Sequence, residues 1–161
     1  MPPSPLSPAL RDVLEATSRS FYLSLRWLPR STRGPVGLTY LLARLADTVA
    51  DTDALAAPAR IAWLDSFRNR LTDPAAAGLD LAGARAAGAD LTPGERRLLR
   101  QAPAVLAAYD GLPAGERAAS RRVLDRIATG MSMDLERFAG GTAQAPAALG
   151  TRADLDRYCY L

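Results

Sequence analysis

Four polar residues are spaced so that they would share one face of an α-helix. Tyr40, Arg44, Asp47 and Asp51 stand at i, i+4, i+7 and i+11, which is one continuous stripe at 3.6 residues per turn. Carboxylates one turn apart repel each other unless a cation lies between them. Because Mg²⁺ commonly joins one or two carboxylates to substrate phosphates, the stripe indicates a site for a metal ion and a polyphosphate.

The stripe also allows a simpler interpretation, an exposed helix face that carries ordinary ion pairs. Arg44 could pair with Asp47, or it could hold a diphosphate through forked hydrogen bonds. Tyr40 could donate to a phosphate, or it could be a core residue with a solvated tip. Acids in an apolar helix need a partner, and the apolar neighbours favour a site: Leu41, Leu42, Leu45 and Val49.

Three other polar residues are candidates for the same chemistry. Ser18 and Ser20 flank Arg19, and small hydroxyls beside a basic residue suit phosphate contact near a helix end. Asp134 follows Ile127 by two helical turns and therefore falls on an apolar face, where an acid must meet an arginine, a metal ion or water. A structural ion pair explains Asp134 as well as a cavity does.

The composition excludes several classes of chemistry and binding. The chain has no histidine and one cysteine, Cys159, so Ser-His-Asp catalysis, Cys-His catalysis and internal disulfides are excluded within these residues. All 20 basic residues are arginine, acids interrupt them, and aromatics make up only 6%; nucleic-acid binding is therefore not expected. No segment has the pattern of a membrane span or a signal peptide, which favours a cytoplasmic protein.

Helical periodicity runs through nearly the whole chain, and we find no convincing strand pattern. An all-α fold is therefore expected, with residues 1–161 forming part of a single domain. Pro35 is expected to open the helix that carries the stripe, over residues 35–52. Residues 30–34, which contain two arginines, are expected to form a basic turn before it.

Capping signals place the later helices. Thr92 and Glu95 form a capping-box pattern that begins a helix. Residues 75–90 are expected to be a loop or a short irregular helix. A long helix is expected over about 114–139, ended by two glycines, and a second capping pattern at 151–154 begins the last helix.

Four motifs follow one another along the chain. They are Ser18-Arg19-Ser20-Phe21, Tyr40-x-x-x-Arg44-x-x-Asp47-Thr48-x-x-Asp51, Gly130-Met131-Ser132-Met133-Asp134-Leu135 and Tyr158-Cys159-Tyr160. In order and spacing, from about residue 17 onward, they resemble the squalene/phytoene synthase family. The resemblance implies an isoprenoid synthase-type helical bundle around a central cavity, incomplete at its C-terminus.

The resemblance also implies an activity and roles for the residues. Members of the family join two prenyl diphosphates head to head through a cyclopropylcarbinyl diphosphate, with Mg²⁺ held by two acidic helices. Asp47 and Asp51 would be the first Mg²⁺-binding pair, and Tyr158 would be catalytic together with Tyr40 and Arg44. Asp134 would be an acid near the cavity. The residues implied around the substrate diphosphate are Ser18, Ser20, Tyr40 and Arg44.

The chain departs from the family pattern in what it lacks. No Val-Ala-Gly follows Leu161, and no second acidic helix is present. Ala50 stands where many squalene synthases have an acid. We therefore expect this 161-residue portion to be inactive by itself. A non-catalytic helical module that pairs with a partner through its apolar surface is the alternative from another class.

Different motifs resemble family members that make different products. Asp47-Thr48 resembles squalene synthases, whereas residues 130–135 resemble phytoene synthases. We favour farnesyl diphosphate as substrate and squalene as product, which implies NADPH; geranylgeranyl diphosphate and phytoene are the alternative. Because the implied prenyl diphosphate substrates carry lipid tails, peripheral membrane contact is also expected.

Overall fold

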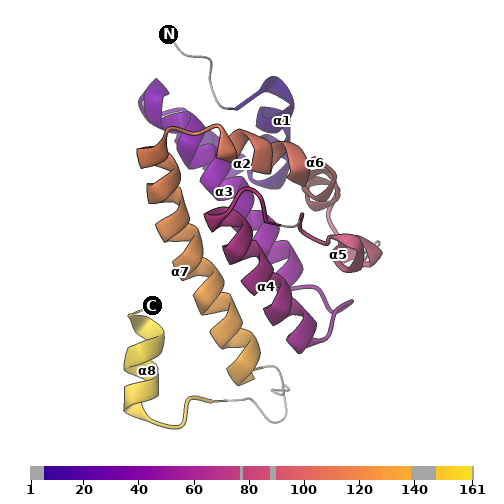
Figure 1. The fold of residues 1–161 in the computed structure, drawn as a ribbon, viewed down its shortest axis with the longest axis vertical. Coiled ribbons are helices and arrows are strands. Elements are labelled where there is room, and N and C mark those ends of the chain that lie inside the picture. The colour runs from indigo at the N-terminus through magenta and orange to yellow at the C-terminus, as the bar shows by residue number, and fades with distance from the viewer. Residues whose placement is uncertain (1–5, 77, 88–89, 139–147, 161) are drawn as a thin grey trace.

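The computed structural model describes residues 6–76, 78–87, 90–138 and 148–160, without the side chain of Arg19. Every regular element in these ranges is an α-helix, which confirms the all-α prediction (Figure 1). The helices are α1 (Pro8–Thr17), α2 (Arg19–Leu25), α3 (Arg30–Ala50), α4 (Ala57–Thr72), α5 (Ala82–Ala86), α6 (Pro93–Asp110), α7 (Ala114–Phe138) and α8 (Arg152–Cys159).

Helix α3 is the centre of the structure, and α1, α2, α4, α6 and α7 all pack against it. Four leucines on its apolar side are completely buried, and each contributes roughly 1.5–3 kcal/mol by leaving water. The stripe is therefore part of a helix whose position is fixed by packing against five other helices. The fully buried leucines of α3 are Leu38, Leu41, Leu42 and Leu45.

Helix α7 lies along α3 and α4 and carries α8 at its C-terminal end (Figure 1). An ion pair of 3.1 Å joins Arg137 of α7 to Asp154 of α8. The ring of Phe138 meets the ring of Tyr158 edge-on, with centroids 6.1 Å apart. These contacts connect α8 to the rest of the structure, although no residue of α8 is buried.

The expected start of the stripe helix at Pro35 is wrong. Residues 30–34 belong to α3 rather than to a separate turn, and Pro35 lies inside the helix. Two local features make this possible. Pro35 lacks an N–H and so loses one helical hydrogen bond close to the N-terminus, where several N–H groups are free anyway. Gly34 precedes it, and without a Cβ it avoids most of the clash with the proline ring.

The other boundaries follow the capping chemistry. Thr92 and Glu95 form a reciprocal capping box at the start of α6, and the Thr151 hydroxyl caps α8 by accepting from the Asp154 N–H at 3.1 Å. Within its described residues, the segment 75–90 contains the five-residue helix α5. Helix α7 ends at Phe138, and the two glycines expected to stop it lie outside the described residues.

No helix in the described ranges is both long and apolar enough to cross a lipid bilayer.

Candidate active site

Arg44 connects two acids that are far apart in the sequence. One guanidinium nitrogen bonds the Asp47 carboxylate one turn along α3. Its Nη2 donates to Glu95 Oε1 of α6 at 2.7 Å, and all three side chains are partly buried. The positive charge of Arg44 thus lies between two carboxylates and neutralises part of their charge.

Glu95 is a site residue that sequence reasoning assigned to helix capping alone. Its Oε2 accepts from the Thr92 N–H at 2.8 Å, while Oε1 accepts from Arg44. Burial alone would raise the pKa of Glu95, but hydrogen bonds from Thr92 and the charge of Arg44 outweigh it and lower that pKa. Glu95 is therefore a charged, two-sided link between the start of α6 and the stripe.

Asp51 ends α3, and its position is electrostatically unfavourable. It is the C-cap residue, where the helix dipole presents partial negative charge. Asp51 is exposed to solvent, yet desolvation by the neighbouring chain, and then the nearby Asp47 charge, raise its pKa; Arg44 and Arg60 oppose the shift. Two acids at the negative end of a helix indicate that a cation would be favoured there.

The serine motif reaches the stripe through an aromatic contact. Ser18 caps α2 by accepting from the Phe21 N–H at 3.3 Å, and its hydroxyl lies 3.5 Å from that of Ser20. The ring of Phe21 stacks on the ring of Tyr40, with centroids 4.0 Å apart and planes 14° from parallel. The serines and Tyr40 therefore belong to one corner of the structure.

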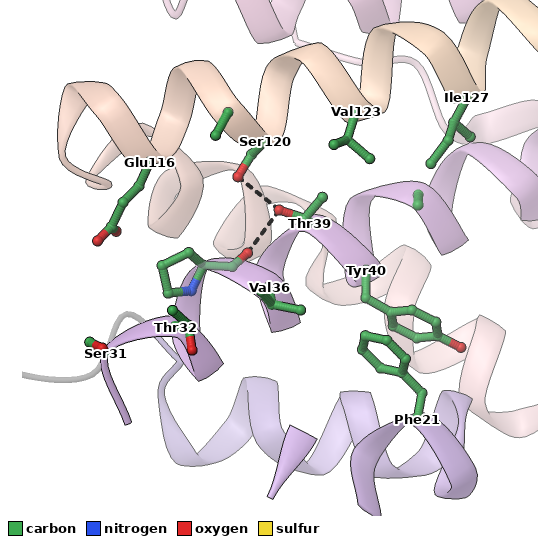
Figure 2. Close-up of a pocket in the computed structure, with 13 residues that line it drawn as sticks. Phe21, Ser31, Thr32, Val36, Thr39, Tyr40, Glu116, Ser120, Val123 and Ile127 are labelled. Atoms are coloured by element: carbon green, nitrogen blue, oxygen red, sulfur yellow. Dashed lines mark hydrogen bonds between the residues drawn. The ribbon is translucent and has the colours of Figure 1, made fainter. Parts of the chain in front are cut away.

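An apolar pocket of about 460 Å³ lies between the first two-thirds of α3 and the first half of α7. Figure 2 shows the stacked rings of Phe21 and Tyr40 at its edge, with Val123 and Ile127 above them on α7. A 2.8 Å hydrogen bond between the hydroxyls of Thr39 and Ser120 joins the two helices at the pocket. Of these residues, the sequence predicted only Tyr40 as a site residue.

On each of the two helices that line the pocket, the lining face carries an acid further along the helix. On α3, Ala43 lines the pocket, and Asp47 follows it by one turn on the same face. On α7, Ile127 lines the pocket, and Asp134 follows it by two turns. Apart from Glu116 at the start of α7, the residues that line the pocket are uncharged, and the acids Asp47 and Asp134 follow further along the two helices.

Asp134 contacts Tyr158 of α8. Their side-chain hydrogen bond, together with the carboxylate charge, raises the pKa of the Tyr158 phenol. The Oδ1 atom of Asp134 is buried and has no hydrogen-bond partner in the described structure. Tyr158 itself is 40% exposed. No arginine pairs with Asp134 in the described ranges, so the structure does not support a simple structural ion pair.

The donor set of the stripe suits a hard divalent cation that also binds substrate oxygens. Asp47 and Asp51 offer two carboxylates one turn apart, and no cluster of three or more potential ligands occurs among the described residues. Mg²⁺ commonly uses one or two carboxylates and completes its shell with phosphate oxygens and water. The Nε of Arg44 is also buried without a partner in this part of the chain, so Arg44 retains a donor.

Comparison with known proteins decides the family. A sequence profile described as squalene/phytoene synthase matches residues 14–161. The chain belongs to the squalene/phytoene synthase family. The match contains all four motifs and covers almost the whole chain.

Individual relatives agree with this family. Squalene synthase BSS of Botryococcus braunii is 37% identical over 62 residues, which are 38% of this chain and 13% of that protein. TcSQS, solved in complexes with the ligands E5700 and BPH1237, superposes in both with a TM-score of 0.68 and 27% identity. The superposition covers 94% of this chain and 39% of TcSQS. The chain thus spans well under half the length of these family members.

Within this family fold, the predicted site residues form two groups. One group is the α3 stripe with the serine corner, joined through the Phe21–Tyr40 stack. The other is the Asp134–Tyr158 pair. Among the described residues we find no hydrogen bond or ion pair that joins one group directly to the other; helical periodicity relates them, through the faces of α3 and α7.

Proposed function

We propose that this chain contributes to a prenyltransferase that joins two prenyl diphosphates head to head. The observation that carries the proposal is the change along the facing sides of α3 and α7, from a pocket whose only charged lining residue is Glu116, at the start of α7, to Asp47 and Asp134 further along. A prenyl diphosphate has the same division, with an apolar tail and a charged head. Membership of the squalene/phytoene synthase family supports the same reaction class.

The diphosphate head would bind at the C-terminal half of α3. Asp47 and Asp51 would hold Mg²⁺, which when bound supplies Lewis-acid stabilisation of the leaving diphosphate. Arg44 would donate to the same diphosphate, because its guanidinium already lies on the stripe and keeps an unused buried Nε–H. Tyr40, Ser18 and Ser20 would add hydroxyl donors from the α2 corner.

The prenyl tail would occupy the apolar pocket. Its lining is almost entirely apolar where it is open, with Phe21, Val36 and Val123 among the contacting side chains. Such walls exclude water from an allylic cation, which water would otherwise capture. The stacked ring of Tyr40 presents a π-face, which stabilises a nearby positive charge.

Tyr158 would act on the proton or the cation at the other end of the site. The phenol is protonated at neutral pH, and Asp134 raises its pKa further above the ordinary value. Tyr158 would therefore assist departure of the diphosphate by donating a hydrogen bond to it.

Farnesyl diphosphate is the proposed substrate, with squalene as product. Asp47-Thr48 and the relatives named as squalene synthases favour it, and geranylgeranyl diphosphate is the alternative. Squalene as the product implies NADPH, which would supply hydride to the final cation.

The test is product analysis with the protein expressed from the complete reading frame that contains these residues. Farnesyl and geranylgeranyl diphosphate should each be supplied with Mg²⁺, with and without NADPH. We expect squalene from farnesyl diphosphate when NADPH is present. Failure to release diphosphate from either substrate would refute the reaction class, whereas phytoene would refute only the substrate assignment.

A further inference from the structure

The corner between α2 and α3 exposes the side chain of Trp27. Trp27 is 92% exposed, and Leu23, one turn earlier, is 54% exposed. The second tryptophan of the chain, Trp63, is buried and donates through Nε1 to the Asp80 carbonyl at 2.7 Å. An exposed tryptophan beside an exposed leucine needs a reason, because large exposed apolar groups commonly mark interaction sites.

Trp27 is exposed on a well-connected backbone. Its N–H donates to the Ser24 carbonyl at 3.1 Å. Arg33 reaches back from α3 and donates through Nε to the Leu28 carbonyl at 2.7 Å and through Nη2 to the Arg26 carbonyl at 2.5 Å. Arg33 thus ties both carbonyls that flank Trp27, so the corner presents its indole in a defined position.

The charged residues in the sequence of the corner have one sign, and Glu116 of α7, which lines the pocket together with Ser31 and Thr32, is an acid from another element. Residues 16–46 contain no acid, although the chain has 17 acidic residues in all. The same stretch contains five arginines, of which Arg26 and Arg30 flank Trp27 closely in sequence and are exposed. A cluster of arginines around exposed apolar side chains is complementary to a surface that is anionic outside and apolar beneath.

We propose that the α2–α3 corner, residues 23–30, docks this protein on an anionic lipid bilayer. Tryptophan prefers the headgroup level of a bilayer, where its ring is apolar and its N–H remains hydrated. Arg26 and Arg30 bind lipid phosphates at the same depth, while Leu23 and Trp27 enter the interface. The docking is peripheral and needs no membrane span.

The corner also borders the apolar pocket. Ser31, Thr32, Pro35 and Val36 line that pocket from the first turns of α3, directly after the proposed docking residues. A bilayer held at the corner therefore lies beside an apolar cavity. This placement would shorten the path of a lipid-tailed molecule; that consequence rests on the proposed function, whereas the docking itself does not.

The test uses this chain with vesicles of phosphatidylcholine alone or mixed with phosphatidylglycerol. We expect sedimentation with the anionic vesicles only, accompanied by a blue shift of tryptophan emission. Because Trp63 is already buried, the shift should be absent in W27F, which keeps a single buried tryptophan. Inorganic phosphate should displace no more protein than sodium chloride at equal ionic strength, which separates lipid headgroups from free phosphate as the ligand.

A charge-matched pair of variants separates a specific corner from diffuse attraction. R26E/R30E alters the corner, whereas R152E/R157E changes the net charge equally at two exposed arginines of α8, which packs at the other end of α7. R26E/R30E should weaken vesicle binding at least about 30-fold, since each arginine near an anionic surface contributes substantially. R152E/R157E should bind within about threefold of the parent chain.

Several results would overturn the proposal. Equal weakening by the two reversal variants would mean non-specific attraction, and vesicle binding without a Trp27 blue shift would place the contact elsewhere. A blue shift that grows with protein concentration in the absence of vesicles would show that another copy covers the corner. Circular dichroism of each variant checks folding, and W27A, altered only at an exposed side chain, provides a second measure of affinity.

Discussion

The guanidinium of Arg44 donates to Glu95 at 2.7 Å across 51 residues of sequence, while it also pairs with Asp47. This contact joins the N-terminus of α6 to the acidic stripe of α3. Glu95 thereby restrains the orientation of Arg44 toward Asp47. The α6 helix thus affects the proposed diphosphate site without contributing a ligand to it.

The first prediction separates the two roles of Glu95. E95Q keeps an oxygen for the Thr92 N–H but removes the charge that holds Arg44, so the KM for prenyl diphosphate should rise about tenfold. T92A removes the reciprocal cap at a cost of about 1 kcal/mol and leaves the Arg44 contact in place. Steady-state kinetics and urea unfolding of both variants separate the two roles. Equal kinetic defects in E95Q and T92A would show that Glu95 acts only as a helix cap.

The second prediction concerns the stripe acids in the protein that contains these residues. D47N and D51N should each lower kcat/KM at least about 100-fold, because loss of a direct ligand exceeds the 10–100-fold effect of outer-sphere changes. D53N is the matched control, since Asp53 is an exposed acid off the stripe. It should change kcat/KM less than about twofold. In Mg²⁺ titrations, only the stripe variants should need a higher Mg²⁺ concentration for half-maximal activity. If D47N had the same kinetics as the parent protein, Asp47 would not be a metal ligand.

The third prediction concerns stability against pH without metal. The pKa of Asp51 is raised above its ordinary 3.8, so its charged form is less favourable in the folded chain than in the unfolded chain. Ionised Asp51 therefore lowers the free energy of unfolding at neutral pH, and this loss disappears as pH falls through the raised pKa. D51N should raise the urea midpoint at pH 7 in EDTA, with a gain that shrinks toward pH 3.8. A constant gain at both pH values would contradict this account.

For Glu95 we expect the opposite contribution to stability: its ionised form stabilises the folded chain. Its pKa is lowered below 4.5, so its contribution to stability is present above that value and is lost as pH falls through the folded pKa. E95Q should therefore lower the urea midpoint at pH 7 and approach the parent chain in acid. The two variants should move in opposite directions in the same denaturation series.

The fourth prediction tests the tail pocket. Val123 is 49% exposed and lines the pocket, so V123W can fill the groove without disturbing the core. We expect activity with geranylgeranyl diphosphate to fall more than activity with farnesyl diphosphate, because the longer tail needs more of the groove. The control variant is R122W, at an exposed neighbouring residue on α7, which should change the activity with either substrate little. Equal losses with both substrates in V123W would place the tail elsewhere.

Local chemistry explains how much of the fold followed from sequence. The Thr92–Glu95 capping box and the Thr151 cap act over three residues, so their positions could be predicted. The start of α3 was not predicted, because proline usually marks a first turn. The helix nevertheless begins at Arg30, because Pro35 lies close enough to the N-terminus to lose only one helical hydrogen bond and Gly34 before it avoids most of the clash with the ring.

The sequence by itself determined the stripe, the serine motif and the family resemblance, because helical periodicity is local and the motifs stand in a fixed order. Tertiary structure decided which partners these residues meet. Glu95 joins Arg44, Phe21 stacks on Tyr40, and Asp134 bonds Tyr158. Each contact joins different helices, and the side chains that meet there depend on how those helices pack; no periodicity within one segment contains that information.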